Sequence, residues 1–235
     1  MPGTLYVCAT PIGHLEDVSL RLLATLREVA VICAEDTRHT QRLLARHDIH
    51  TPLTSCHEHT SPNKIRALAT RLAEGESLAL VTDAGTPGVS DPGPRLVRAA
   101  AELDVPVTPI PGPCALAAAL SISGLDAQRF SFLGFLPRKP GKHRKALEEA
   151  AARNETLVIY ESPYRVVATL EALAAIAPTR PVSVCRELTK KFEEVLRGTT
   201  REAAAELAQR KEVRGEFVIV MGTGDASGQS EQLEE

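Results

Sequence analysis

The stretch that decides the fold is residues 83–93, which runs Asp83-Ala84-Gly85-Thr86-Pro87-Gly88-Val89-Ser90-Asp91-Pro92-Gly93. It follows the apolar run 78–81 and precedes a segment with a helical pattern. Its glycines, prolines and aspartates cannot extend a helix or a central strand, so they predict a tight loop that lets backbone approach a ligand. Open α/β sheets bind ligands where strands end, although such residues also simply terminate strands.

Two further loops of similar composition follow other predicted strands. Thr10-Pro11-Ile12-Gly13 comes after the predicted strand 4–9, and Pro111-Gly112-Pro113 follows the predicted strand 107–110. Three such loops at strand ends favour a shared ligand site over three unrelated strand terminations.

The first half of the chain alternates strand and helix patterns. Strands are expected at residues 4–9, 29–34, 52–56, 78–82 and 107–110. Leu20, Leu23 and Leu26 mark one helix, and Ile65, Leu68, Ala69 and Leu72 give a second helix its apolar stripe. The alternation predicts an α/β fold with a mainly parallel sheet and helices on both faces.

The second half predicts a separate domain with a mixed sheet. A helix at 115–121 and a strand at 130–135 begin it, and Val167, Leu170 and Ala174 mark the face of a later helix. Strands 181–187 and 193–199 can form an antiparallel pair, and 216–220 closes the sheet. We therefore expect domains at 1–113 and 114–224, followed by a disordered acidic tail at 225–235.

Composition limits the protein class without choosing its partner. The chain has 235 residues, 43% of them hydrophobic, and a net charge of -3, which predicts a globular protein. Its start lacks a secretory pattern and no apolar run is long enough to span a bilayer, so we expect a cytoplasmic protein without membrane contact. Its five cysteines are scattered without paired spacing, which favours reduced thiols. Cys56-His57-Glu58-His59 lacks a second ligand cluster, so no metal is expected.

Two polar segments at strand ends are candidates for chemistry. Neither common glycine-rich phosphate motif occurs, which favours a ligand held by backbone and apolar walls, such as an S-adenosyl cofactor. Glu35, Asp36, Arg38 and His39 form a general-base cluster or an ion-paired helix start with Asp36 as its cap. The segment His57-Glu58-His59 is a second candidate for contact with a substrate.

One basic segment stands out in a slightly acidic chain. Residues 137–145 contain Arg138, Lys139, Lys142, Arg144 and Lys145. Nucleic-acid phosphates are the favoured partner, and a solvated helix start is the alternative. Pro140-Gly141 is expected to interrupt the run, while Arg186, Lys190 and Lys191 can extend the basic surface.

Several segments together resemble a known family. They are Thr10-Pro11-Ile12-Gly13, Glu35-Asp36-Thr37-Arg38, residues 83–93, Pro111-Gly112-Pro113, Tyr160-Glu161-Ser162-Pro163, residues 186–191 and Gly215-Glu216-Phe217. In order and spacing they are similar to ribosomal RNA small subunit methyltransferase I over residues 3–221. The resemblance implies the two-domain tetrapyrrole methylase fold with the cofactor in the cleft between the domains, and a homodimer. It also implies S-adenosylmethionine-dependent methylation of a cytidine 2'-hydroxyl in the decoding region of 16S rRNA, within the 30S subunit.

The same resemblance assigns candidate cofactor contacts. In the first domain these are Pro11, Gly13, Asp83, Ala84, Gly85, Val89, Ser90, Pro111 and Gly112. On the second-domain side they are Tyr160, Pro163, Glu216 and Phe217. His14, Cys114 and Tyr164 depart from the residues expected there, which argues against a side-chain role at these positions.

Methylation of a hydroxyl sets the expected catalytic roles. Glu35, or else His39, accepts the hydroxyl proton, and Lys190 or Arg38 stabilises the developing oxyanion. Two other functions stay open, because a fold does not determine a substrate. One is methylation of a small tetrapyrrole such as a precorrin, and the other is a non-catalytic role in RNA binding or ribosome assembly.

Overall fold

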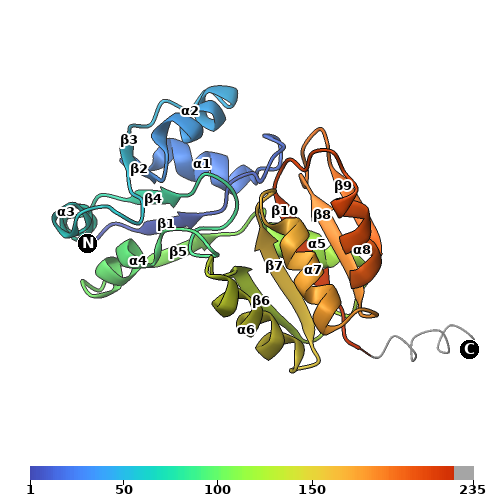
Figure 1. Ribbon diagram of the computed structural model, residues 1–235. Coiled ribbons are helices and arrows are strands. Elements are labelled where there is room, and N and C mark those ends of the chain that lie inside the picture. Colours follow the sequence, from blue (N-terminus) through green and yellow to red (C-terminus); the bar gives the residue numbers. More distant parts are fainter. Residues whose placement is uncertain (225–235) are drawn as a thin grey trace, which may run out of the picture. The chain divides into compact units, whose positions relative to one another are not determined.

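The computed structural model describes residues 1–224, and the tail predicted at 225–235 lies outside the described residues. The chain divides into two compact units after Cys114. Each unit contains a five-stranded sheet (Figure 1). The boundary after Pro113 between independently folding domains stays a prediction.

The first unit alternates strands and helices along the chain. Its elements are β1 (Leu5–Cys8), α1 (Leu20–Glu28), β2 (Val31–Ala34), α2 (Thr37–Arg46), β3 (Leu53–Ser55), α3 (Pro62–Ala73), β4 (Leu78–Val81), α4 (Pro94–Ala101) and β5 (Val107–Ile110). The strand order is β3-β2-β4-β1-β5, and every neighbouring pair is parallel. The predicted parallel sheet is confirmed, and all its carboxyl ends meet at one edge.

Both faces of this sheet are covered, which explains why β4 is apolar at every position. Leu78 and Leu80 belong to the core with α3 and α4, whereas Ala79 and Val81 belong to the core with α1 and α2. Successive side chains of a strand point to opposite faces, so both sets are buried.

Local sequence signals begin the helices of this unit. Ser19, Asp36 and Ser61 accept hydrogen bonds from backbone N–H groups in the first turns of α1, α2 and α3. Asp36 is thus the predicted cap. The four predicted residues of α3 are the ones that it buries.

The helix that Leu20, Leu23 and Leu26 marked is confirmed as α1, although its buried residues are partly different. The helix buries Leu22 and Leu26, while Leu20 is 87% exposed. Leu20 is the first helical residue after the Ser19 cap. The buried side of α1 therefore begins at Leu22 and not at Leu20.

The second unit has the predicted mixed sheet. Its elements are α5 (Ala115–Ser123), β6 (Phe130–Phe135), α6 (Pro140–Ala151), β7 (Thr156–Glu161), α7 (Val166–Ile176), β8 (Pro181–Arg186), β9 (Glu194–Thr199), α8 (Thr200–Ala208) and β10 (Phe217–Met221). The order is β6-β7-β10-β8-β9, in which β6 and β7 are parallel and the other pairs antiparallel. The β8–β9 pair is as predicted.

Three details of this unit differ from the sequence predictions. Strand β10 lies at the centre of the sheet between β7 and β8 and does not close an edge, which fits its fully buried sequence. The buried face of α7 is Val166, Thr169, Leu170 and Leu173, so Val167 and Ala174 only flank it. Pro140 and Gly141 do not interrupt the basic segment, because Pro140 begins α6, where its missing N–H costs nothing.

No helix within residues 1–224 combines the length and the apolar character that a membrane crossing requires.

Candidate active site at the strand ends of the first unit

Three loops meet at the carboxyl edge of the parallel sheet. Thr10 and Gly85 exchange backbone hydrogen bonds of 2.9 and 3.0 Å, and the Thr86 hydroxyl donates to the Pro113 carbonyl at 3.1 Å. A Cβ added to Gly112 would lie 3.1 Å from the Ala9 Cβ, so only glycine packs this closely without a shift. We call Thr10, Gly85, Thr86, Gly112 and Pro113 the three-loop junction. It unites the three loops that the sequence singled out.

A reciprocal pair of hydrogen bonds joins the ends of β2 and β4. The Asp36 N–H donates to Asp83 Oδ1 at 2.9 Å, and the Asp83 N–H faces Glu35 Oε2 at 3.4 Å. The order of strands places β2 beside β4, which explains why segments nearly fifty residues apart meet. Glu35 is thereby held beside the loop of residues 83–93.

The four polar residues after β2 have different environments. Burial raises the pKa of Glu35; the Asp83 N–H opposes this, and the Asp83 and Glu58 carboxylates add to it. The hydrogen bonds from Arg38 lower the pKa of Asp36 to about 2, which leaves Asp36 a charged helix cap. Arg38 and His39 are exposed. A half-buried carboxylate with a raised pKa is the better proton acceptor of the two acids.

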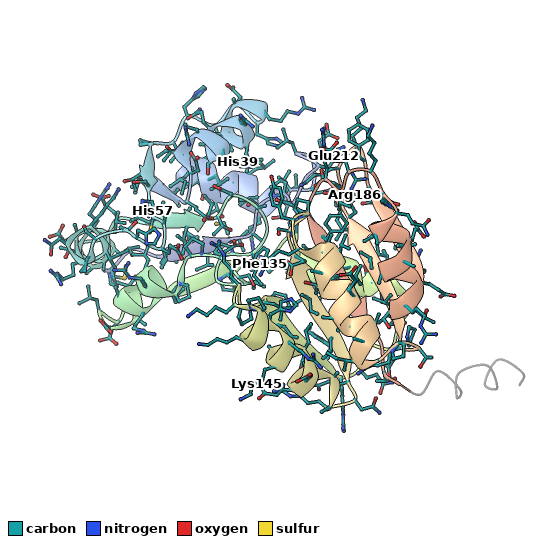
Figure 2. The ribbon with its side chains drawn as sticks, in the orientation of Figure 1. His39, His57, Phe135, Lys145, Arg186 and Glu212 are labelled. Atoms are coloured by element: carbon teal, nitrogen blue, oxygen red, sulfur yellow. The ribbon has the colours of Figure 1, made fainter. Side chains whose placement is uncertain are left out.

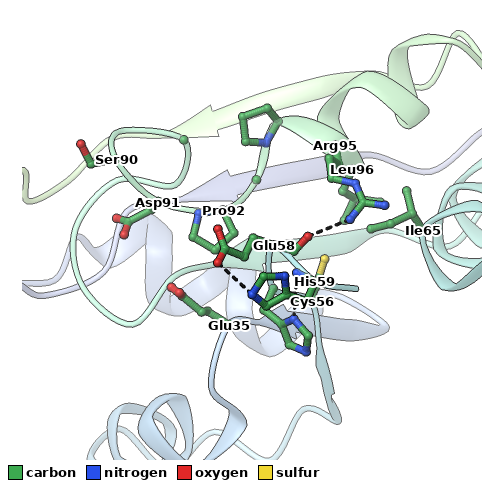
Figure 3. Close-up of a pocket in the computed structure, with 14 residues that line it drawn as sticks. Glu35, Cys56, Glu58, His59, Ile65, Ser90, Asp91, Pro92, Arg95 and Leu96 are labelled. Atoms are coloured by element: carbon green, nitrogen blue, oxygen red, sulfur yellow. Dashed lines mark hydrogen bonds and ion pairs between the residues drawn. The ribbon is translucent and has the colours of Figure 1, made fainter. Parts of the chain in front are cut away.

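A pocket of about 600 Å³ adjoins Glu35 (Figure 3). One wall is the segment after β3, which contains Cys56, His57, Glu58 and His59. The other wall comes from residues 88–96, with Ile65 completing the lining. The segment His57-Glu58-His59, a candidate from sequence, thus shares a pocket with Glu35.

Arg95 shapes this pocket and was missed by sequence reasoning. Its guanidinium Nη1 donates to the carbonyls of Glu58 and Thr60 at 2.9 and 2.8 Å. These bonds connect α4 to the loop after β3. A single arginine in the first turn of a helix carries no local signal that it contacts a loop 35 residues earlier.

The predicted cofactor residues of the second unit occupy two places. The Tyr160 ring contacts the rings of Phe132 and Phe135 edge to face, and its hydroxyl accepts a hydrogen bond from the Leu116 N–H at 2.9 Å. Phe217 is buried in the core, and in β10 it is paired with Glu161 of β7 and Arg186 of β8. Pro163 is partly buried in the loop after β7.

Lys190 lies between two carboxylates. Its ammonium contacts Glu187 at 2.9 Å and Glu216 at 2.8 Å, and Glu187 also accepts from the Glu216 N–H. Burial lowers the pKa of Lys190, but the bonds to Glu216 and Glu187 outweigh it and raise the pKa above the ordinary value. The positive charge of Lys190 is therefore balanced by the carboxylates of Glu187 and Glu216.

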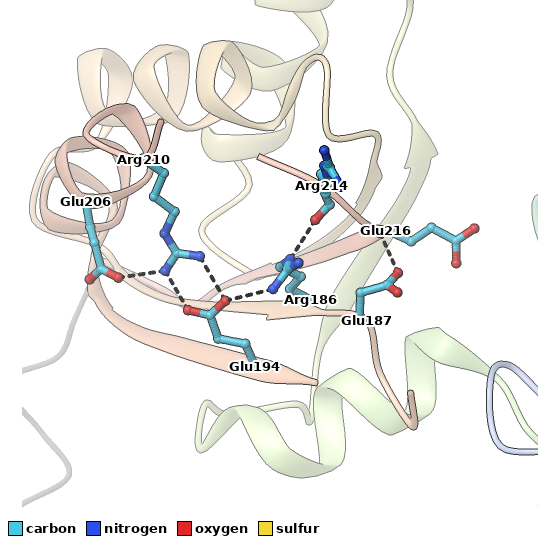
Figure 4. A network of polar contacts seen from close by, with 7 residues as sticks. All are labelled: Arg186, Glu187, Glu194, Glu206, Arg210, Arg214 and Glu216. Atoms are coloured by element: carbon cyan, nitrogen blue, oxygen red, sulfur yellow. Dashed lines mark hydrogen bonds and ion pairs between the residues drawn. The ribbon is translucent and has the colours of Figure 1, made fainter. Parts of the chain in front are cut away.

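Neighbouring charges of this unit are also paired. Arg210 contacts Glu194 and Glu206, and Arg186 contacts Glu194 and donates to the Arg214 carbonyl (Figure 4). Arg186 is therefore not available as an uncompensated extension of a basic surface.

The basic segment covers the start of α6 (Figure 2). Arg144 and Lys145 form ion pairs with Glu148 and Glu149 one turn later. Arg138, Lys139 and Lys142 are exposed, and no side-chain bond joins them to another described residue. Phosphate contact would therefore depend most on these three.

The buried carboxylate of Glu161 is connected to the basic segment through Arg165 and Thr169. Glu161, the last residue of β7, accepts from Arg165 at 2.8 Å and from the Thr169 hydroxyl at 2.9 Å. His143 Nε2 lies 3.0 Å from the same hydroxyl, and Arg165 also donates to the Leu136 carbonyl just before the basic segment. Sequence reasoning quoted Glu161 within a motif but assigned it no role.

Burial makes four of the cysteines poor nucleophiles. It raises the pKa of Cys8 and Cys33 to about 12 and also raises the pKa of Cys56 and Cys185. All five thiols are free. Within the described chain, no three His, Cys, Asp or Glu side chains gather as metal ligands would.

Comparison with known proteins identifies the family of the chain. A family model for tetrapyrrole (corrin/porphyrin) methylases matches residues 4–204. Ribosomal RNA small subunit methyltransferase I of Halalkalibacterium halodurans is 49% identical over 224 residues, covering 95% of this chain and 77% of the relative. The enzyme of the same name from Xylella fastidiosa is 50% identical over 222 residues, covering 94% and 81%. The chain belongs to the ribosomal RNA small subunit methyltransferase I family.

Membership in the methyltransferase I family confirms the resemblance seen in the sequence motifs. Among solved structures, a uroporphyrin-III C-methyltransferase from Thermus thermophilus, complexed with S-adenyl homocysteine, matches with a TM-score of 0.63. The match covers 94% of this chain and 97% of that chain at 24% identity. The match confirms the tetrapyrrole methylase fold that the sequence motifs predicted.

Proposed function

We propose that the chain transfers a methyl group from S-adenosylmethionine to the 2'-hydroxyl of a cytidine in the decoding region of 16S rRNA. The observation that carries this proposal is the reciprocal pair between Asp36 and Asp83 and between Asp83 and Glu35. It holds a proton-accepting carboxylate beside the loop proposed to hold the methyl donor. The names of the relatives support ribosomal RNA as the methyl acceptor.

The three-loop junction has the chemistry that an S-adenosyl group needs. Gly112 is exposed and packs against Ala9, whereas Gly85 is buried and uses its N–H and carbonyl in hydrogen bonds with Thr10, which fixes the loop around it. Backbone groups and apolar walls suit a ligand with a nucleoside and an amino-acid part. We propose that Pro11, Gly13, residues 83–85, Val89, Ser90, Pro111 and Gly112 hold it, where it would supply an electrophilic methyl group. The roles of Tyr160, Pro163, Glu216 and Phe217 remain predictions from the family resemblance.

The chain's own contribution to the chemistry is the handling of a proton. In this proposal a Glu35 carboxylate oxygen accepts the hydroxyl proton of the ribose, and the raised pKa of Glu35 favours that acceptance at neutral pH. His39 is the second candidate base. Arg38 and Lys190 are the candidates for oxyanion stabilisation; Arg38 is paired with one carboxylate, Asp36, and Lys190 with two, Glu187 and Glu216.

The basic segment is proposed to contact RNA phosphates. Arg138 and the cap residue Lys139 directly precede α6, and Lys142, Arg144 and Lys145 lie near its start; all five are exposed. Such a surface gains affinity by releasing counterions from the nucleic acid. A small tetrapyrrole would not need it, which favours the RNA substrate. A homodimer and a cytoplasmic location complete the proposal.

Transfer of tritiated methyl from S-adenosylmethionine to three acceptors tests it. The acceptors are 30S subunits, free 16S rRNA and a precorrin, and nuclease digestion of labelled RNA locates the methyl group. We expect label on a cytidine ribose of the rRNA. Label on the precorrin would support the tetrapyrrole function, and RNA binding without any transfer would support a non-catalytic role.

A further inference from the structure

The pocket beside Glu35 adjoins the proposed cofactor site, with which it shares Ser90. Its lining includes Glu35 and Ser90 but not Thr10, Gly85 or Gly112, the central residues of the three-loop junction. Glu35 therefore borders this pocket while facing the Asp83 backbone. A volume of about 600 Å³ is within the range of small-ligand sites.

Both walls of the pocket are held in place. On one side, Arg95 binds the carbonyls of Glu58 and Thr60, and the His57 N–H donates to the Thr60 hydroxyl at 2.9 Å. On the other side, Ser90 has a positive φ of 62°, and a Cβ on Gly93 would lie 3.4 Å from the Gly88 nitrogen. A site with fixed walls loses little conformational freedom on binding.

The charges of the pocket define what it can accept. Glu35, Glu58 and Asp91 contribute carboxyl groups to its lining, and Figure 3 shows one oxygen of Glu58 in contact with the His59 ring, at 3.0 Å. The Arg95 guanidinium is bound to two carbonyls. An anionic group such as a phosphate is therefore disfavoured here, whereas a neutral group with N–H donors is favoured.

Histidines add a second kind of recognition. His57 Nδ1 accepts from the His59 N–H at 3.2 Å, and the two rings meet edge to face at 6.2 Å. Imidazole faces are stacking surfaces for unpaired bases, and carboxylates accept hydrogen bonds from the exocyclic amino group of cytosine. The carbonyl at the same position of uracil would instead repel a carboxylate.

From this geometry, and resting on the function proposed above, we infer that the pocket receives the acceptor nucleoside, an unstacked cytidine. Glu58 accepts from the amino group of the base, His57 supports the ring, and the phosphates stay outside. Glu35 at the border then faces the ribose. Enzymes that act on a nucleotide commonly take it out of its stack into such a pocket.

Kinetics of methyl transfer to 30S subunits test this inference. The variants are Glu58→Gln, His57→Ala and their combination, all at exposed side chains. Glu74→Gln and His50→Ala are matched controls, because both are exposed and do not line the pocket. The dissociation constant of S-adenosylmethionine and the thermal midpoint are measured on the same samples.

We expect the combined variant to raise KM for 30S subunits at least about tenfold, as loss of specific base contacts does. Cofactor affinity and thermal midpoint should match those of the controls. An unchanged KM in an active variant would overturn the inference, and so would weaker cofactor binding with an unchanged KM. A wild-type chain that transfers no methyl group to rRNA would instead overturn the proposed function and the inference together.

Discussion

Glu35 and Glu161 both lie at strand ends, but they differ in burial and in the number of hydrogen bonds that they accept. Glu35 directly follows β2, and Glu161 is the last residue of β7. Glu161 is buried and accepts from Arg165, the Thr169 hydroxyl and the Ser162 N–H at 2.8 to 2.9 Å. Glu35 is half buried and has one long contact of 3.4 Å with the Asp83 N–H.

The difference shows what each carboxylate can do. The buried Glu161 carboxylate accepts from three partners, so it holds these neighbours in one geometry. Burial destabilises the charged form of Glu35, and its single long hydrogen bond offsets only part of that cost. Its carboxylate therefore takes up a proton readily. Glu161 therefore supports the basic segment, and Glu35 is suited to react.

The largest expected effect is on stability, from Glu161→Ala. Removal of this carboxylate takes its counter-charge from Arg165, which keeps its bond to the Leu136 carbonyl, and we expect a loss of about 3 kcal/mol in the free energy of unfolding. Urea denaturation at pH 7 measures it. Glu35→Ala is the matched control and should cost less than about 1 kcal/mol. Equal losses at the two positions would contradict the distinction between them.

The next effect is a pH dependence that belongs to Glu35. Since burial raises its pKa, methyl transfer should fall about tenfold per pH unit once the pH drops below that raised value. The folded state also binds this proton more tightly than the unfolded state, so the contribution of Glu35 to stability decreases as pH rises from its ordinary pKa to the raised one. Glu35→Gln should remove both dependences. Initial rates and urea midpoints across this range would show whether they persist.

The basic segment should respond to salt according to which of its charges are already paired. Replacing Arg138, Lys139 and Lys142 with alanine should reduce the slope of log affinity against log salt by about two, at about 0.7 per phosphate contact on single-stranded RNA. Replacing Arg144 and Lys145, which have glutamate partners, should change the slope by less than one. Filter binding of 16S rRNA between low and moderate salt gives both slopes. An identical slope in all three proteins would place the RNA elsewhere.

The smallest effect is expected from Thr169→Val, which keeps the shape of the side chain. It removes the hydroxyl that donates to Glu161 and faces His143. We expect a loss of about 1 kcal/mol in stability, as for one buried hydrogen bond. The comparable substitution Thr199→Val at the α8 cap is a control for hydroxyl loss away from the basic segment. No difference between wild type and Thr169→Val in urea midpoint would mean that Glu161 does not need this donor.

Sequence patterns predicted the parts of the molecule that depend on local rules. Leu78 to Val81 could be recognised as a doubly covered strand, and Asp36 as a cap, because periodicity and side-chain chemistry act within a few residues. The bond from Arg95 to Glu58 and the central place of β10 depend on which segments meet in space. No local pattern records that information, so both were found only in the structure.

The candidate site shows the same division. Glu35 and residues 83–93 were selected from strand-end chemistry, but only the order β2-β4-β1 explains why they meet. Glu161 was hidden because a buried carboxylate and an exposed one look alike in sequence. Its partners, Arg165 and Thr169, lie one and two turns further along, at spacings that many solvated helices share.

Single-turnover methyl transfer by Glu35→Gln tests the central claim most directly. The variant is saturated with S-adenosylmethionine and mixed with excess 30S subunits, and cofactor affinity and urea midpoint are determined in parallel. We predict that the rate falls at least about tenfold while cofactor affinity and stability are retained, because the amide cannot accept the hydroxyl proton. A rate equal to that of the wild type would contradict the account and remove Glu35 from the chemistry.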